Sequence, residues 1–419
     1  MDHSTGFSLS GQSLPLIGTA ERRARLGARH WLSGEADSIE QTTDGLVALH
    51  ATDPATVFLS VSARQATATV DDVEAALFER RTMARTLAMR RTLFVATLDG
   101  LGDVELSSSP GVAALERRRL EQFLADSGVD EPASWLHSAF DEVLKSLDHP
   151  DGLAARAVTA AVPLLATKLV MGAGTKHEVT ANATSRTLGL MAVEGRIVRG
   201  RPNGDWTGRQ YTWHRRDRWW STDPSYPADL PTGGGELAVE TEEKAAIRLL
   251  ARWLGRFGPA TMADMKWWTG WTMTKTRAAL AEIETAEVSL DGALAGTTGF
   301  VLAEDVEPVP AGPAWARLLP SLDPTAMGWK DRDWYLGPHK AKLFDRNGNI
   351  GPTVWVDGRI VGAWSQTKSG EVVTELLEPV GAEHLALIEA DKERVTNFVG
   401  DVVVRPSFPT PLQKQLSGK

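Results

Sequence analysis

Side chains at residues 50 to 53 have types and spacing that could support hydrolysis. The run His50-Ala51-Thr52 is followed directly by Asp53-Pro54. Histidine is mostly neutral near pH 7, so its imidazole can accept a proton from water, whereas the hydroxyl of Thr52 can orient a water but cannot act as its base. We therefore expect His50 to carry more of any such chemistry than Thr52.

The dipeptide Asp53-Pro54 predicts the start of a helix, with Asp53 at the N-cap and proline at the first helical position. His50 to Thr52 would then lie in an exposed turn between two helices. The alternative for His50 is a structural role, in which the imidazole hydrogen-bonds the last carbonyl groups of the preceding helix. Asp53 could serve as a simple cap, as a support for the site, or as both.

Basic residues are concentrated in two stretches, although the 419-residue chain has a net charge of −9. Residues 196–218 hold seven arginines and two aspartates, a local charge of +5, and residues 77–98 hold five arginines and one glutamate, +4. Arginine pairs with phosphate in a forked geometry, so both stretches favour DNA contact, with a solvated surface as the alternative. Tyr211 and Trp213 lie among these arginines and either wedge at a base step or pack the segment onto its domain. The candidate DNA-binding residues are Arg90, Arg91, Arg196, Arg199, Arg201, Arg209, Tyr211, Arg215 and Arg216.

Helices followed by a short two-stranded hairpin recur along the chain, in the order typical of a winged helix. In the clearest copy, a helix begins at Thr184, and strands at 196–201 and 209–214 are joined through Asn203-Gly204, a dipeptide suited to tight turns. The arginines of 196–218 would lie on this wing. Five tryptophans (Trp219, Trp220, Trp267, Trp268 and Trp271) are assigned to core packing and to no chemistry.

The predicted fold class is α+β, with three tandem winged-helix units followed by a C-terminal β-rich, barrel-like domain. Further helices are predicted near 21–33, 38–50, 54–64, 70–88, 241–257, 275–284 and 381–398. Further strands are predicted at 92–98, 288–290, 299–302, 341–346, 353–356, 359–365, 371–377 and 402–405. The predicted domains are a flexible N-terminus (1–20), unit 1 (21–105), unit 2 with the basic wing (106–222), an acidic linker (223–240), unit 3 (241–308) and the β-rich domain (309–419).

Several classes of protein are excluded or disfavoured. Cysteine is absent, which excludes disulfides, thiolate zinc sites and cysteine nucleophiles. The chain lacks zinc-protease, P-loop and dinucleotide-binding motifs, and its nine histidines are dispersed, so we expect neither a metal nor a cofactor. No window approaches the roughly 18 apolar residues of a membrane span, and no secretory signal is evident. We therefore expect a cytoplasmic monomer without a membrane partner.

Four stretches resemble the AlkZ-like (YcaQ-like) winged-helix DNA glycosylases. They are Gly45 to Pro54 (Gly-Leu-Val-Ala-Leu-His-Ala-Thr-Asp-Pro), Met89 to Leu93 (Met-Arg-Arg-Thr-Leu), Leu318-Leu319-Pro320 and Asp357-Gly358-Arg359. The likeness spans most of residues 21–405. It implies three winged-helix units and a C-terminal β-domain, and an activity that removes N7-alkylated purines and unhooks DNA crosslinks. Members near antibiotic gene clusters confer self-resistance to alkylating natural products.

The resemblance also implies which residues form the active site. The family motif is Gln, an apolar residue, then Gln or Asp, followed by Asp-Pro; the matching positions here hold His50, Ala51 and Thr52 before Asp53-Pro54. The family's Arg-Gly-Thr-Leu-His corresponds to Arg90, Arg91, Thr92, Leu93 and Phe94. His50, Thr52 and Asp53 are therefore the candidate catalytic residues.

Three hypotheses follow for function. The first is a DNA repair glycosylase that hydrolyses the N-glycosidic bond of bulky or crosslinked N7-alkylated purines in double-stranded DNA, using a variant His-Ala-Thr motif. The second is a non-catalytic winged-helix DNA-binding protein, either a damage binder or a transcriptional regulator. The third is a regulator that senses a small molecule, which would need a pocket that a sequence cannot reveal.

Overall fold

The computed structural model describes residues 13–172, 174–176, 178–220 and 241–418. The predicted acidic linker at 223–240 lies outside the described residues, as do residues 1–12 of the predicted flexible N-terminus. The described part of that N-terminus contains the short strand β1 (Leu16–Ile17), which pairs in parallel with β10 (Thr285–Leu290). Residues 16–17 are thereby attached to the third unit.

The first unit carries the His50 segment on a small sheet. Its three strands are in the order β2-β4-β3, and His50 pairs with Phe94 across the β2/β4 ladder. The elements are α1 (Thr19–Arg29), α2 (Ile39–Gly45), β2 (Leu49–His50), α3 (Pro54–Ser62), α4 (Val70–Glu74), the π-turn η1 (Ala75–Glu79), β3 (Met83–Leu87), the 3-10 turn η2 (Met89–Arg91) and β4 (Leu93–Thr97).

Two predicted helices of this unit are shorter than expected. The helix predicted near 38–50 ends at Gly45, where the indole of Trp31 packs so closely that a Cβ would lie 2.5 Å from its Nε1. The helix predicted near 70–88 ends in the π-turn η1, and residues 83–87 form β3. Both corrections have the same cause, because β2 and β3 form through pairing with β4, a contact that local helical periodicity does not reveal.

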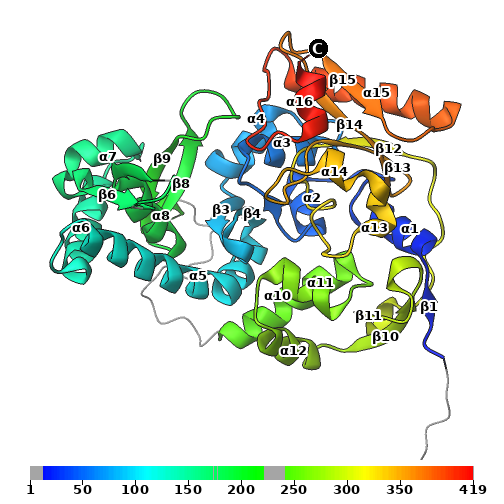
Figure 1. Cartoon of the computed structure of the whole chain (residues 1–419), viewed down its shortest axis with the longest axis horizontal. Helices are drawn as coiled ribbons and strands as arrows, with labels where there is room; N and C mark the ends of the chain where they lie inside the picture. The colour runs from blue at the N-terminus through cyan, green and yellow to red at the C-terminus, as the bar shows by residue number, and fades with distance from the viewer. Residues whose placement is uncertain (1–12, 173, 177, 221–240, 419) are drawn as a thin grey trace, which may run out of the picture.

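The second unit forms a lobe of its own (Figure 1). Most of its buried residues between Leu120 and Trp213 form a hydrophobic core of their own, whereas Val198 and Trp206 belong to the core of the rest of the chain. The elements are α5 (Leu98–Asp126), α6 (Pro132–Ser146), β5 (Leu153–Ala154), α7 (Ala155–Ala161), η3 (Pro163–Ala166), β6 (Lys168–Met171), β7 (Val179–Asn182), α8 (Thr184–Val193), β8 (Ile197–Pro202), β9 (Tyr211–Arg215) and α9 (Arg216–Trp219). The predicted helix and hairpin are confirmed, but Thr184 is the first helical residue and not the cap, since Ala183 occupies the N-cap.

The tip of this hairpin is attached to the first unit. Trp206, in the connection between β8 and β9, is 5 % exposed and lies 5.1 Å from the ring of Phe58 on α3 and 6.0 Å from that of Phe398. Arg201 forms ion pairs with Glu74 and Glu79 of the first unit. The wing therefore bridges the two lobes, as Figure 1 shows, and is not a free arm.

The third unit and the C-terminal domain share one continuous core with the first unit. The third unit contains α10 (Glu242–Phe257), α11 (Met262–Thr269), α12 (Met273–Ala281), β10, η4 (Gly292–Leu294), β11 (Thr298–Leu302) and η5 (Ala303–Asp305), and its sheet has the order β1-β10-β11. Its predicted helices and hairpin are confirmed, and each of the three units carries a three-stranded sheet; their description as three winged helices stays a prediction.

The C-terminal domain is built on an open antiparallel sheet in the order β12-β13-β14-β15, so the expected barrel-like closure is wrong. Its elements are β12 (Ala316–Leu319), α13 (Asp333–Leu336), η6 (Gly337–His339), α14 (Lys340–Leu343), β13 (Thr353–Val356), β14 (Arg359–Gln366), β15 (Val372–Leu376), α15 (Ala382–Val399) and α16 (Pro411–Ser417). The predicted strand at 341–346 is instead helical at 340–343. Residues 402–405 form no strand because Gln366 takes over their hydrogen bonds, donating to the Val402 carbonyl and accepting from the Val404 N–H.

A buried ion pair joins the first unit to the C-terminal domain. The guanidinium of Arg64 and the carboxylate of Asp323 are both fully buried and make two hydrogen bonds of 2.8 and 2.9 Å. Arg64 also donates to the carbonyl groups of His30 and Ser60 and to the hydroxyl of Thr325. Within the part of the chain that the structure describes, no helix is both long and apolar enough to cross a membrane.

Replacing Asp323 by Asn tests the importance of this ion pair. The neutral amide leaves the buried charge of Arg64 uncompensated, so we expect unfolding in urea to need less denaturant, with a loss of about 3–5 kcal/mol. The matched control is Asp217→Asn, which removes the exposed partner of Arg215 and should cost less than about 1 kcal/mol. Equal losses in the two variants would contradict a structural role for the buried pair.

Candidate active site

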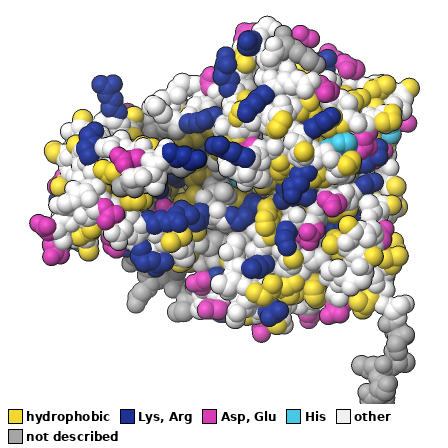
Figure 2. Space-filling view, viewed as in Figure 1, with side chains coloured by type: hydrophobic (Ala, Val, Ile, Leu, Met, Phe, Trp, Pro, Cys, Tyr) yellow, Lys and Arg dark blue, Asp and Glu magenta, His cyan; other side chains and the backbone are white. Residues whose placement is uncertain are grey.

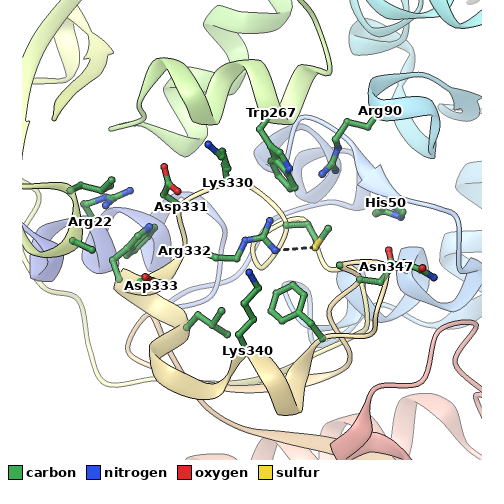
Figure 3. A pocket seen from close by; sticks show the side chains of 18 of the residues that line it. Arg22, His50, Arg90, Trp267, Lys330, Asp331, Arg332, Asp333, Lys340 and Asn347 are labelled. Atoms are coloured by element: carbon green, nitrogen blue, oxygen red, sulfur yellow. Dashed lines mark hydrogen bonds between the residues drawn. The ribbon is translucent and has the colours of Figure 1, made fainter.

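A cleft of about 780 Å³ opens where the first unit, the third unit and the C-terminal domain meet. The first unit contributes His50 and Arg90, the third unit contributes Trp267 of α11, and the C-terminal domain contributes most of the rest, between residues 327 and 349. Figure 3 shows these side chains directed into a common space. The cleft is within the size range of small-molecule and cofactor sites, which is about 300–1,000 Å³.

His50 ends β2 and forms part of the cleft wall. Its side chain is 4 % exposed and packs on Phe94, with 5.2 Å between ring centroids. The backbone N–H of Thr52 donates to Nδ1 at 3.4 Å. The expected exposed turn between two helices is therefore wrong: pairing of β2 with β4 draws the segment into the protein and leaves the imidazole at the cleft.

The imidazole of His50 is held in its neutral form. Burial lowers its pKa to about 3, and the nearby positive charge of Arg90 acts in the same direction. At pH 7 the ring can therefore form hydrogen bonds without placing a positive charge at the cleft. A base this weak can hold a water molecule but cannot remove its proton before the water has reacted.

Thr52 and Asp53 do not join His50 at the cleft. The hydroxyl of Thr52 is buried and has no hydrogen-bond partner among the described residues, and Thr52 contributes no lining to the cleft. Asp53 occupies the N-cap of α3, as the sequence predicts, but its side chain makes no cap hydrogen bond. Its Oδ2 accepts instead from the N–H of Ser407 at 2.9 Å. Asp53 therefore holds the C-terminal segment against α3.

Arg90 and Arg91 point to different surroundings. Both adopt left-handed backbone angles, with φ of 53° and 59°. Arg90 lines the cleft, and its guanidinium carbon lies 4.1 Å from the ring centroid of Trp267. Arg91 is paired with Glu116 of α5 and does not line the cleft. Of the two, Arg90 is the one placed beside His50.

Several cleft residues are absent from the sequence-based prediction. The missing basic residues are Arg22, Lys330, Arg332 and Lys340, and the missing aromatic residues are Trp267, Trp334 and Phe344. The dense charged run Lys330-Asp331-Arg332-Asp333 before Trp334 was the available sequence signal. Trp267 is partly buried against the core, as expected, but it also lines the cleft, whereas Trp219, Trp220, Trp268 and Trp271 are buried.

Arg22 places a buried positive charge at the cleft. It is 2 % exposed, stacks 4.2 Å from the ring centroid of Trp334, and its Nε and Nη2 have no hydrogen-bond partner among the described residues. Burial lowers its pKa to about 10, so it remains charged at neutral pH. Asp291 also lines the cleft, but it accepts hydrogen bonds from the backbone N–H and hydroxyl of Thr19.

Comparison with known proteins identifies the family. A model of the family described as "DNA glycosylase AlkZ-like" matches residues 43–398. The chain belongs to the AlkZ-like DNA glycosylase family. The solved structure of the Streptomyces sahachiroi DNA glycosylase AlkZ superposes with a TM-score of 0.66 and 21 % identity, covering 93 % of this chain and 98 % of that one.

A curated relative from the same organism, named "Interstrand DNA cross-link repair glycosylase", is 31 % identical over 160 residues. That match covers 36 % of this chain and 41 % of the relative, so the chain spans about two fifths of the length of the curated relative it matches. The family match includes His50, Arg90, Trp267 and the charged run at 330–333.

In this AlkZ-like protein most wing arginines are already paired with acidic residues. The pairs are Arg196 with Glu194, Arg201 with Glu74 and Glu79, Arg215 with Asp217, Arg216 with Glu105, and Arg218 with Asp148. Arg199 lies over the ring of Trp213 at 4.7 Å, and Arg85 lies over that of Tyr211 at 4.6 Å. Arg209 is exposed and forms no ion pair within the described residues.

These pairings change how the wing could contact DNA. Figure 2 shows Lys and Arg side chains around a hollow between the lobe of the second unit and the rest of the molecule. Tyr211 and Trp213 are 9 % and 8 % exposed, so packing describes them better than insertion between bases. Among the described residues, no group of three or more metal-ligating side chains gathers at any point.

The ring resonances of His50 should not titrate between pH 8 and pH 5, because its pKa is near 3. Between about pH 6.5 and pH 3 the unfolded chain binds a proton at His50 that the folded protein does not, so this residue lowers stability as the pH falls. NMR of the imidazole, assigned by comparison with His50→Gln, measures the titration. A midpoint near 6.5 would show that the ring is solvated.

Arg216 and Arg209 should respond differently to replacement by Ala. Arg216 is 4 % exposed and makes two hydrogen bonds of 2.9 and 2.8 Å to Glu105, so its loss should destabilise the protein by about 3 kcal/mol. Arg209→Ala should keep the stability within about 0.5 kcal/mol and weaken DNA binding. Urea unfolding and duplex binding measure the two effects. If Arg216→Ala is as stable as the wild type but binds DNA more weakly, the result would support the predicted phosphate contact of Arg216.

Proposed function

We propose that this protein is a monomeric DNA glycosylase that hydrolyses the N-glycosidic bond of N7-alkylated purines in duplex DNA. The observation that carries the proposal is a neutral, buried His50 at the wall of a cleft that is otherwise rich in positive charge. Family membership supports the reaction class. The name of the curated relative makes crosslinked purines candidates for the substrate.

The chemistry of the substrate explains how a weak base could suffice. Alkylation at N7 gives the purine a positive charge, so it leaves as a neutral base with the electron pair of the glycosidic bond. The sugar then has oxocarbenium character, as in glycoside hydrolysis generally. Water adds to C1′, and its proton is released after the new C–O bond has formed. A neutral imidazole holds this water without repelling the sugar cation.

The three residues of the motif have different roles in this proposal. His50 orients the water. Thr52 positions the imidazole through its backbone N–H, so its hydroxyl is dispensable. Asp53 supports the site from behind, by holding the C-terminal segment at Ser407. Arg90 and the exposed Arg209 contact phosphates.

A second function is favoured by a specific observation. Among His50, Thr52 and Asp53, the cleft lining includes His50 but neither of the other two side chains. A protein that binds alkylated DNA and leaves the glycosidic bond intact does not need Thr52 or Asp53 at the cleft. Release of free base from a lesion separates the two functions, since a binding protein leaves the glycosidic bond intact.

The test is base release from a duplex that contains one N7-methylguanine. We expect the wild type to release the base and leave an abasic site, and His50→Ala to be slower by about 100-fold, because the attacking water loses its orientation. Thr52→Ala should stay within about threefold of the wild type, because it keeps the backbone N–H. Binding of the same duplex by His50→Ala serves as the control for folding. Binding without base release in the wild type would establish the non-catalytic function.

A further inference from the structure

Two guanidinium groups share the ring of Trp267 in the cleft. The guanidinium carbon of Arg90 lies 4.1 Å from the ring centroid, and that of Arg332 lies 4.8 Å from it. The two arginines come from η2 and from the C-terminal domain, so Trp267 on α11 brings together charges from distant parts of the sequence. Figure 3 shows the three side chains grouped together, with Arg90 on the side that faces His50.

No acidic residue among those described lies within ion-pair distance of Arg90 or Arg332. The Nε of Arg332 donates to the carbonyl of Trp329 at 3.0 Å, and the Nε of Arg90 is buried without a partner. Burial lowers the pKa of Arg90 to about 10, and the charge of Arg332 contributes in the same direction. Like charges this close repel each other, so an anion that binds between them is stabilised by both.

The arrangement is fixed by the residues around it. Asp264 of α11 is fully buried and closes the capping box with Thr261, and its other oxygen accepts from the N–H groups of Lys330 and Asp331 at 2.9 and 3.1 Å. One carboxylate therefore sets α11 against the run that carries Arg332. At the end of α11, a Cβ on Gly270 would lie 2.9 Å from the backbone nitrogen of Arg90, so glycine permits the close approach of η2.

We propose that Arg90, Trp267 and Arg332 form a phosphodiester-binding site, which holds the DNA backbone next to the nucleotide whose glycosidic bond faces His50. Guanidinium groups bind phosphate through charge-assisted, often forked hydrogen bonds, and stacking on an indole orients them in advance. Arg90 and Arg332 contact the phosphate in this site, and Trp267 is a positioning residue for both guanidinium groups. The inference rests on the proposed function for the location of the lesion, but binding of undamaged duplex tests the phosphate site separately.

The first experiment measures affinity for an undamaged duplex as a function of NaCl concentration. For Arg332→Met in the full chain, we expect the slope of log K against log[salt] to become shallower by about 1, as for the loss of one phosphate contact. Arg332→Lys keeps the charge and should restore the slope. The control is Arg277→Met, which removes an exposed arginine of α12 outside the cleft and should leave the slope unchanged.

A second variant separates charge from orientation. Trp267→Leu keeps both guanidinium groups, so we expect an unchanged slope but roughly threefold to tenfold weaker binding at one salt concentration, from the loss of cation–π stacking. Thermal unfolding of each variant monitors folding. An unchanged slope in a folded Arg332→Met variant would overturn the proposal.

These outcomes are independent of the glycosylase test. If the wild type releases no base but the salt slope depends on Arg332, the proposed function is overturned and the phosphate site is supported. A wild type that releases base, with a slope that is indifferent to Arg332, would do the reverse.

Discussion

The ion pair between Arg64 and Asp323 is the interaction on which the cleft depends. Arg64 follows α3 in the first unit, while Asp323 precedes the segment that forms the opposite wall of the cleft. Both charges are fully buried, and desolvation makes such a pair expensive unless each donor and acceptor is satisfied. Ser60, His30 and Thr325 supply the remaining hydrogen bonds. This network of hydrogen bonds therefore fixes the positions of the two cleft walls relative to each other.

The parts of the chain that form the cleft share one hydrophobic core, and the second unit forms a lobe beside them. The first unit, the third unit and the C-terminal domain share a hydrophobic core, whereas the second unit has its own. The lobe is attached through α5 on one side and through Trp206 on the other. Trp206 buries its indole against Phe58, which makes the wing a second point of attachment. DNA contacts on the wing would thus be held at a defined distance from His50.

The features that the sequence predicted correctly are those determined by neighbouring residues. The hairpin of β8 and β9 depends on strand formers around Asn203-Gly204, and α8 begins at Thr184 as its local pattern indicates. The environment of His50 depends instead on pairing between Leu49 and Val95, 46 positions apart, which no local pattern contains. Thus His50 was found as a residue, but its burial and lowered pKa were not. The place of Trp267 at the cleft is hidden for a related reason, because a tryptophan that only packs on a core and one that also lines a cleft look the same in sequence.

The distribution of charge shows most clearly what a local sequence pattern cannot predict. The +5 stretch at 196–218 is the obvious basic feature of the sequence, yet five of its seven arginines form ion pairs with acidic residues, one of them nearly 130 positions away. The cleft gains its positive charge from single residues that are far apart, such as Arg22, Arg90 and Arg332. Local net charge counts side chains, whereas phosphate binding depends on which of them lack a carboxylate nearby. Arginines without such partners are therefore better guides to a nucleic-acid site than arginine-rich segments, and in this protein two of them, Arg90 and Arg332, line the same cleft as His50.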